Sequence, residues 1–207
     1  KNFKKKFYKI PIYSKSLLLE EVNLFFKWYV PHIFNKKKRF KINSQLRKVI
    51  SSLLKKIKLP NNTFVHRDFH VSNLMLKKRV ISVIDSQDAV YGNIAYDLAS
   101  LIDDVRLRTS KNVKEMIYKE YLYLNKKKIN IKKFKNDFDI LSVLRNLKII
   151  GIFTRLANRD NKKQYLKLIP HAWELIELRI KNNYIFKDLK KNLGTNFPKK
   201  IRIKKWK

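Results

Sequence analysis

Two histidines, an aspartate and an asparagine lie within a short polar stretch, FVHRDFHVSNLML, at residues 64–76. Apolar residues typical of β-strands flank this polar cluster on both sides. A carboxylate such as that of Asp68 can accept or orient the proton of a hydroxyl group. A neutral amide such as that of Asn73 can hold Mg²⁺ without adding another charge. The residue types and their spacing therefore favour transfer of a phosphoryl group to an alcohol.

His66, Arg67 and Asp68, followed after four residues by Asn73, match the H-R-D-x-x-x-x-N pattern of kinase catalytic loops. In that pattern the aspartate is the catalytic base and the asparagine binds Mg²⁺. An isolated aspartate is more often a turn residue or a helix cap. Four matching identities at fixed spacing make coincidence a poor explanation, so we predict that Asp68 is the base and Asn73 a metal ligand.

A second metal ligand is expected at Asp85, directly after the apolar run at residues 80–84. A turn at residues 77–79 would make this run the second strand of a hairpin and return Asp85 to Asn73. The following residues, Ser86 and Gln87, differ from the D-F-G sequence of protein kinases. We predict Mg²⁺ and ATP as the cofactors of this site.

His66 and His70 could instead suggest zinc, because they are four residues apart. A helical zinc motif of this spacing would need a glutamate beside the first histidine, where this chain has Arg67. The segment also reads as strand, loop and strand. A zinc site is therefore excluded.

The chain has 207 residues, of which 44% are hydrophobic, enough for the core of one domain. It contains no cysteine, which excludes a disulfide framework and fits a cytoplasmic location. No apolar run is long enough to predict a membrane span. The chain begins with lysine, so we expect a piece of a longer chain or a processed product.

The net charge of +34 is compatible with nucleic acid or an anionic membrane as a partner. The lysines, however, are spread over the whole chain among many isoleucines and asparagines, a pattern that the base composition of a genome also produces. No recognisable nucleic-acid motif is present. Nucleic-acid binding is therefore kept only as the third interpretation.

Apolar spacing predicts helices at residues 17–29, 44–58, 96–108, 113–124, 134–158 and 162–182, and short strands at 63–65, 74–76 and 80–84. Ser44 is the expected N-cap of the second helix, and Pro31 is expected to end the first. The segment around Gly92 is expected to be a loop, and the tail after Gly194 to be loose. The expected fold is a mostly helical α+β domain with a small β-hairpin that carries the catalytic and metal residues.

The segments HRDFHVSNL and DSQDAVYGNIAYDLASLIDD resemble those of the aminoglycoside phosphotransferase/choline kinase-like superfamily, which shares the protein-kinase fold. Within it, the chain is most similar to bacterial kinases that phosphorylate N-acetylmuramate and N-acetylglucosamine at the anomeric position. The resemblance runs from about residue 10 to residue 189. It implies an ATP-dependent and Mg²⁺-dependent kinase with a small-molecule acceptor, an amino sugar.

The resemblance also implies roles for individual residues. Asp68 would be the base, Asn73 and Asp85 the Mg²⁺ ligands, and Asp97 an anchor for the backbone of the catalytic loop. Further candidates are two loop supports, His66 and Arg67, and five residues near the substrate, His70, Gln87, Asp88, Asp104 and Arg155. A polar helix face explains Asp104 equally well, and the end of a core helix explains Arg155 better.

One part of a kinase is missing from the sequence, namely the small lobe that binds ATP. The three glycines, Gly92, Gly151 and Gly194, are too far apart for a glycine-rich loop. We therefore expect a basic lead-in or interlobe linker at residues 1–16, a kinase-like C-terminal lobe at 17–190 and a basic tail at 191–207. The small lobe would belong to a longer chain or a separate chain. The alternative is a non-catalytic binding scaffold of the same fold.

Overall fold

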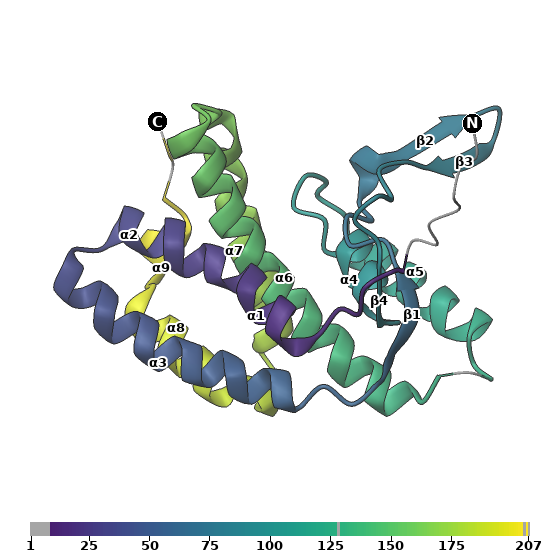
Figure 1. The fold of residues 1–207 in the computed structure, drawn as a ribbon, viewed down its shortest axis with the longest axis horizontal. Coiled ribbons are helices and arrows are strands. Elements are labelled where there is room, and N and C mark those ends of the chain that lie inside the picture. Colours follow the sequence, from purple (N-terminus) through teal and green to yellow (C-terminus); the bar gives the residue numbers. More distant parts are fainter. Residues whose placement is uncertain (1–8, 128, 205, 207) are drawn as a thin grey trace, which may run out of the picture.

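The computed structural model describes residues 9–127, 129–204 and 206. It is mostly helical with two small antiparallel sheets, which confirms the predicted α+β class (Figure 1). The helices are α1 (Lys15–Leu24), α2 (Val30–Ile33), α3 (Lys36–Lys55), α4 (Tyr96–Ile102), α5 (Lys111–Leu124), α6 (Ile131–Arg159), α7 (Ile169–Ile180), α8 (Lys187–Asn196) and α9 (Lys199–Arg202). The strands are β1 (Asn61–Val65), β2 (Leu74–Lys77), β3 (Val80–Val83) and β4 (Val90–Asn93).

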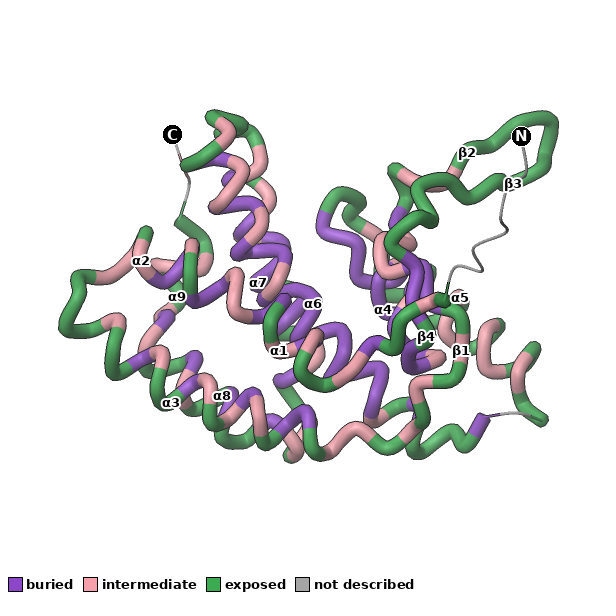
Figure 2. The backbone as a smooth tube through the Cα atoms, in the orientation of Figure 1, coloured by how far each residue is buried: buried purple, intermediate pink, exposed green. Residues whose placement is uncertain are grey.

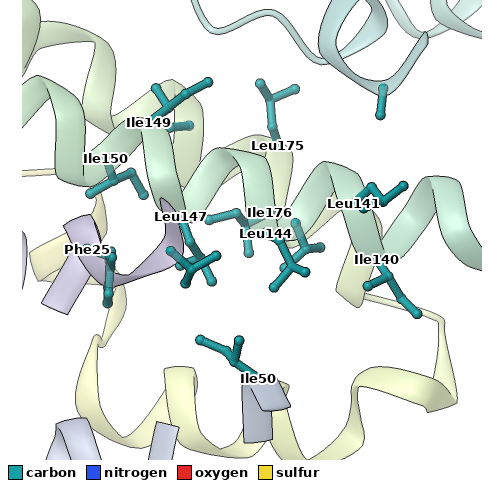
Figure 3. Close-up of a cluster of buried hydrophobic side chains, with 14 of the residues drawn as sticks. Phe25, Ile50, Ile140, Leu141, Leu144, Leu147, Ile149, Ile150, Leu175 and Ile176 are labelled. Carbon is teal, nitrogen blue, oxygen red and sulfur yellow. The ribbon is translucent and has the colours of Figure 1, made fainter. Parts of the chain in front are cut away.

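Helix α6 runs through the hydrophobic core, and α1, α4 and α7 pack against it. Figure 2 shows a nearly continuous buried band along α6, as expected for a helix that is covered on most sides. In Figure 3, Leu144 and Leu147 of α6 lie among Ile176 of α7, Phe25 and Ile50. Burying each such side chain contributes about 1.5–3 kcal/mol to folding. This core supports the loop that carries the polar cluster.

Gly151 allows α6 to approach the N-terminal helices closely. A Cβ atom at this position would lie 2.3 Å from the carbonyl carbon of Leu24 and 2.4 Å from the amide nitrogen of Phe25. These atoms mark the point where α1 passes into a π-helical turn at Phe25–Tyr29. Only glycine leaves room for the two backbones at this distance.

The predicted hairpin is confirmed as β2 and β3, which pair from Leu74 with Val83 to Lys77 with Val80. Lys78 and Arg79 form its turn with φ angles of 47° and 67°, as a two-residue hairpin turn requires. The strand predicted at residues 63–65 is also present, as part of β1. It pairs with β4, which lies in the segment around Gly92 that was expected to be a loop. That expectation was wrong because glycine and asparagine in β4 weaken its strand signal, although Gly92 packs directly against Val65.

Two helices begin or end elsewhere than predicted. Helix α3 begins at Lys36 instead of Ser44, because the Asn35 side chain accepts a hydrogen bond from the Lys38 amide at 3.1 Å and caps it there. The lysines that follow are good helix formers, so the helix does not need an apolar face in its first turns. The helix predicted at 96–108 ends at Ile102, where Asp103 leaves the helical conformation.

The expected helix ends at proline residues also need correction. The first helical segment continues past Pro31, which lies in the first turn of α2. The segment predicted as one helix at 162–182 starts as a 3₁₀-helix at Lys163–Leu168, and α7 follows with Pro170 in its first turn. Within the described residues the tail is not loose, since α8 and α9 are formed and the Phe197 ring packs at a tilt against Trp173 with ring centres 5.4 Å apart.

The β2–β3 hairpin projects from the rest of the molecule and is exposed along its length (Figures 1 and 2). Leu76 is 74% exposed and Ile81 is 65% exposed. Neighbouring strand residues point to opposite faces, and Met75 is also exposed, so both faces carry uncovered apolar side chains. Within the described ranges, no helix is both long and apolar enough to cross a membrane.

Candidate active site

The loop between β1 and β2 carries the polar cluster, and Asp97 of α4 holds its backbone. The Asp97 carboxylate accepts hydrogen bonds from the amide nitrogens of His66 at 2.7 Å and Arg67 at 3.1 Å. Burial raises the pKa of Asp97, although these two amides act in the opposite direction. Arg67 has a φ angle of 70°, a left-handed conformation that costs a non-glycine residue about 1–3 kcal/mol. The paired hydrogen bonds help to keep it there.

His66 connects this loop to the segment that follows the hairpin. Its ring is buried, and Nε2 lies 2.9 Å from the carbonyl oxygen of Ile84. Because a carbonyl oxygen can only accept, Nε2 carries the proton in this hydrogen bond. The contact places the catalytic loop beside the residue that precedes Asp85.

Asp68 and Asn73 are joined within the loop. The backbone carbonyl of Asp68 accepts a hydrogen bond from Nδ2 of Asn73 at 2.9 Å. The Asn73 amide therefore keeps its oxygen for another partner. The Asp68 side chain is half-buried, and its carboxylate has no hydrogen-bond or ion-pair partner among the described residues. A carboxylate in this state can accept a proton from a bound alcohol.

Asp85 lies close to Asn73 because the hairpin closes on itself. The Ile84 amide donates to the Asn73 carbonyl at 3.1 Å. Asp85 has a φ angle of 70°, and its Oδ1 accepts a hydrogen bond from Nε2 of Gln87 at 2.6 Å. The hairpin thus holds an amide oxygen and a carboxylate at its base, at Asn73 and Asp85.

This donor set fits Mg²⁺, which prefers oxygen ligands and is commonly held by one or two carboxylates together with substrate phosphates. Among the described residues, no group of three or more histidine, cysteine, aspartate and glutamate side chains could hold a metal by itself. A site made of Asn73 and Asp85 would therefore depend on a bound nucleotide for its remaining ligands.

The structure also brings Asp104 next to the part of the loop that contains His70. The Asp104 carboxylate accepts hydrogen bonds from the amides of Val71 at 3.1 Å and Arg106 at 3.0 Å. His70 is buried, and burial lowers its pKa, as does the charge of Arg106. Because Val71 follows His70 directly, Asp104 supports the far end of the catalytic loop.

The other residues predicted to lie near the substrate have fewer contacts with the catalytic loop. Asp88 is exposed, and only its backbone carbonyl contacts the loop, through Nη1 of Arg67 at 3.2 Å. Arg155 makes no hydrogen bond or ion pair with the loop within the part of the chain that the structure describes, and its Nε is buried without a partner. Gln87 contacts Asp85, as described above. The structure thus groups His70, Gln87 and Asp104 with the loop, but not Arg155.

Two charged residues beside the loop were missed by sequence reasoning. Glu21 of α1 forms an ion pair with Nη2 of Arg67 at 2.5 Å. The same Glu21 oxygen lies 3.0 Å from Nζ of Lys148 in α6. The available signal was the presence of Arg145, Asn146 and Lys148 within the apolar middle of α6.

Residues 16–128 match the phosphotransferase enzyme family APH, and this match covers more than half of the chain. The chain belongs to this phosphotransferase family. The hairpin, the catalytic loop and Asp97 all lie inside the matched region. The superfamily resemblance read from the sequence is therefore confirmed.

Several relatives of this phosphotransferase chain share one name. This chain is 33% identical over 166 residues to the N-acetylmuramate/N-acetylglucosamine kinase of Neisseria meningitidis, and the match covers 78% of this chain and 50% of that protein. It is 33% identical over 178 residues to the kinase of the same name from Pseudomonas putida, covering 81% and 51% respectively. The Pseudomonas aeruginosa protein of that name is 28% identical over 176 residues, covering 83% and 52%. The chain thus spans about half the length of the curated relatives that it matches.

Proposed function

We propose that the full-length protein transfers the γ-phosphate of ATP to a hydroxyl group of an N-acetylated amino sugar. This chain would contribute the kinase-like C-terminal lobe with the catalytic loop. The observation that supports this most strongly is the carboxylate of Asp68, which has no partner in the part of the chain that the structure describes and lies in a loop with Asn73, beside the hairpin end that carries Asp85. The names of the relatives support the acceptor class.

In this proposal each residue has one task. Asp68 accepts a hydrogen bond from the acceptor hydroxyl and takes its proton as the phosphoryl group is transferred. Asn73 and Asp85 hold Mg²⁺ through their oxygens. When bound with ATP, Mg²⁺ supplies positive charge that stabilises the phosphoryl oxygens. Asp97 and His66 keep the loop and the hairpin end together, so that the base and the metal ligands stay close.

The exposed hairpin supports the proposal that a second lobe exists. A two-stranded hairpin is marginally stable in water, and uncovered apolar side chains on both faces make an interaction surface. Leu76 and Ile81 would be covered by a small lobe that binds ATP, in a longer chain or a separate one. The length of the relatives, about twice that of the matched segment, is in line with this.

The test is an assay of phosphate transfer from ATP to N-acetylglucosamine and N-acetylmuramate by the full-length native product, with the sugar phosphate detected by mass. We expect Asp68→Asn to lower kcat by about 10²–10⁴-fold, because the amide cannot take the proton. Asp188→Asn, on the exposed side of α8, is the control and should leave the rate unchanged. Equal rates for wild type and Asp68→Asn would overturn the assigned role.

A further inference from the structure

A group of buried charges connects the catalytic loop to helices α1 and α6. One oxygen of Glu21 lies 2.5 Å from Nη2 of Arg67 and 3.0 Å from Nζ of Lys148. The Tyr13 hydroxyl donates to the other oxygen and is 3.0 Å from the Tyr96 hydroxyl. The side chains of Glu21 and Lys148 are only 10% and 12% exposed. One carboxylate thus binds two cations, of which Lys148 is largely shielded from water and Arg67 is partly exposed.

Glu21 and Lys148 each stay charged because of their neighbours. Burial alone would raise the pKa of Glu21, but Lys148 and the hydrogen bonds from Tyr13 and Arg67 outweigh it and lower that pKa. Burial alone would lower the pKa of Lys148, but Tyr96 and Glu21 outweigh it and raise that pKa. Removing Glu21 would leave Arg67 and Lys148 without their shared carboxylate, and removing Lys148 would take away the charge that lowers the pKa of Glu21 most.

Arg67 connects this group of charges to the residues proposed to react. Its backbone amide is bound by Asp97, and its Nη1 donates to the carbonyl of Asp88, three residues after Asp85. Its backbone has the left-handed φ of 70° directly before Asp68. The Arg67 side chain therefore joins the loop of the base to the segment of the metal ligand, and Glu21 holds that side chain.

We propose that Glu21 and Lys148 are positioning residues for phosphoryl transfer. They hold Arg67 in place and so set the relative position of Asp68 and the Asp85–Asp88 segment. The catalytic consequence rests on the function proposed above, whereas the effect on the loop does not. An ion pair that only stabilised the core would change global stability without a selective effect on the loop.

The first test measures hydrogen exchange in the 207-residue chain, which needs no activity. We expect Glu21→Gln and Lys148→Met to speed exchange of the amides at residues 66–73 by about tenfold or more relative to the amides of α7. Asp139→Asn is the matched control, because Asp139 is a buried carboxylate of α6 whose partners, Lys135, Asn183 and Arg179, lie outside the loop. It should not change loop exchange. Unchanged loop exchange in both test variants would overturn the proposal.

The second test measures the kinetics of the full-length protein with ATP and an N-acetylated amino sugar. Displacement of catalytic groups by about 1 Å can cost about 10²-fold in rate, so Glu21→Gln and Lys148→Met should lower kcat on that scale. They should also raise the Mg²⁺ concentration for half-maximal rate, while KM for the sugar stays unchanged. Lys148→Arg, which keeps the charge, should recover most of the rate.

The outcomes separate the two proposals. A wild-type protein that phosphorylates no amino sugar contradicts the proposed function, and the loop exchange still decides whether Glu21 and Lys148 position the loop. An active wild type whose Lys148→Met variant keeps both its kcat and its Mg²⁺ dependence contradicts the catalytic part of this inference.

Discussion

At the scale of residues, two positions in the site have unfavourable backbone conformations. Arg67 and Asp85 both have φ angles of 70°. Arg67 directly precedes the proposed base Asp68, and Asp85 is itself a proposed metal ligand. Such conformations persist only where surrounding contacts hold them, and they concentrate at functional sites. Here the contacts are Asp97 with the Arg67 amide and Gln87 with the Asp85 carboxylate. The strained residues thus lie where precise placement would matter most.

The proposed metal ligands give a prediction at this scale. Asp85→Asn keeps the size of the side chain but removes the negative charge that binds Mg²⁺. Because even outer contacts of a metal site contribute about 10–100-fold in metal affinity, we expect the half-saturating Mg²⁺ concentration to rise by at least about tenfold. A Mg²⁺ titration of the rate of the full-length protein measures this. An unchanged Mg²⁺ requirement would remove Asp85 from the proposed site.

The local motif residues could be predicted from the sequence, but their distant supports could not. Asp68 and Asn73 are five residues apart, so one loop brings them together and their spacing is visible in the sequence. Glu21 and Arg67 are 46 residues apart, and only the tertiary structure brings α1 next to the catalytic loop. No local pattern encodes such a contact.

At the scale of elements, apolar periodicity was enough to place the long helices but not their ends. Helix α6 was predicted at 134–158 and spans Ile131–Arg159. The start of α3, after its N-cap Asn35, was missed because it depends on one capping hydrogen bond. Strand β4 was missed because its pairing with β1 comes from the tertiary structure and not from strong strand formers in its own sequence.

The close contact at Gly151 gives a prediction for the core. Gly151→Ala should lower the free energy of unfolding by about 1–3 kcal/mol, because its Cβ would overlap the backbone of Leu24 and Phe25. Gly194→Ala in α8 is a matched control, since a Cβ there would meet no atom within 4 Å. It should raise stability by about 0.5–1 kcal/mol through better helix propensity. Denaturant unfolding of both variants measures the difference, and equal shifts would contradict the packing described here.

At the scale of the whole molecule, the charge is distributed unevenly between inside and outside. Several of the 16 acidic residues are buried, namely Glu21, Asp103, Asp104, Asp137 and Asp139. Their carboxylates bind backbone amides or cations inside the protein. The surface is therefore even more basic than the net charge of +34 suggests. The charge by itself points to no specific partner, because such a surface attracts any polyanion.

The exposed hairpin and the length of the relatives both suggest that this chain works as one part of a larger protein. The base and the metal ligands would be here, and the ATP-binding lobe elsewhere. The absence of a glycine-rich loop could be read from the sequence, because that loop has a local composition. The lobe that would cover Leu76 and Ile81 could not be predicted in detail, since its contacts lie outside these residues.

The most direct measurement compares phosphate transfer from ATP to N-acetylglucosamine by the full-length native product and by the 207-residue chain alone. We predict turnover by the full-length protein and none by the isolated chain, because the proposal places the base and the metal ligands in this chain and the ATP-binding lobe outside it. Adding the missing segment as a separate chain should restore some turnover. A full-length product that transfers no phosphate to any amino sugar would contradict the proposed function. An isolated chain that is fully active would contradict the division into lobes.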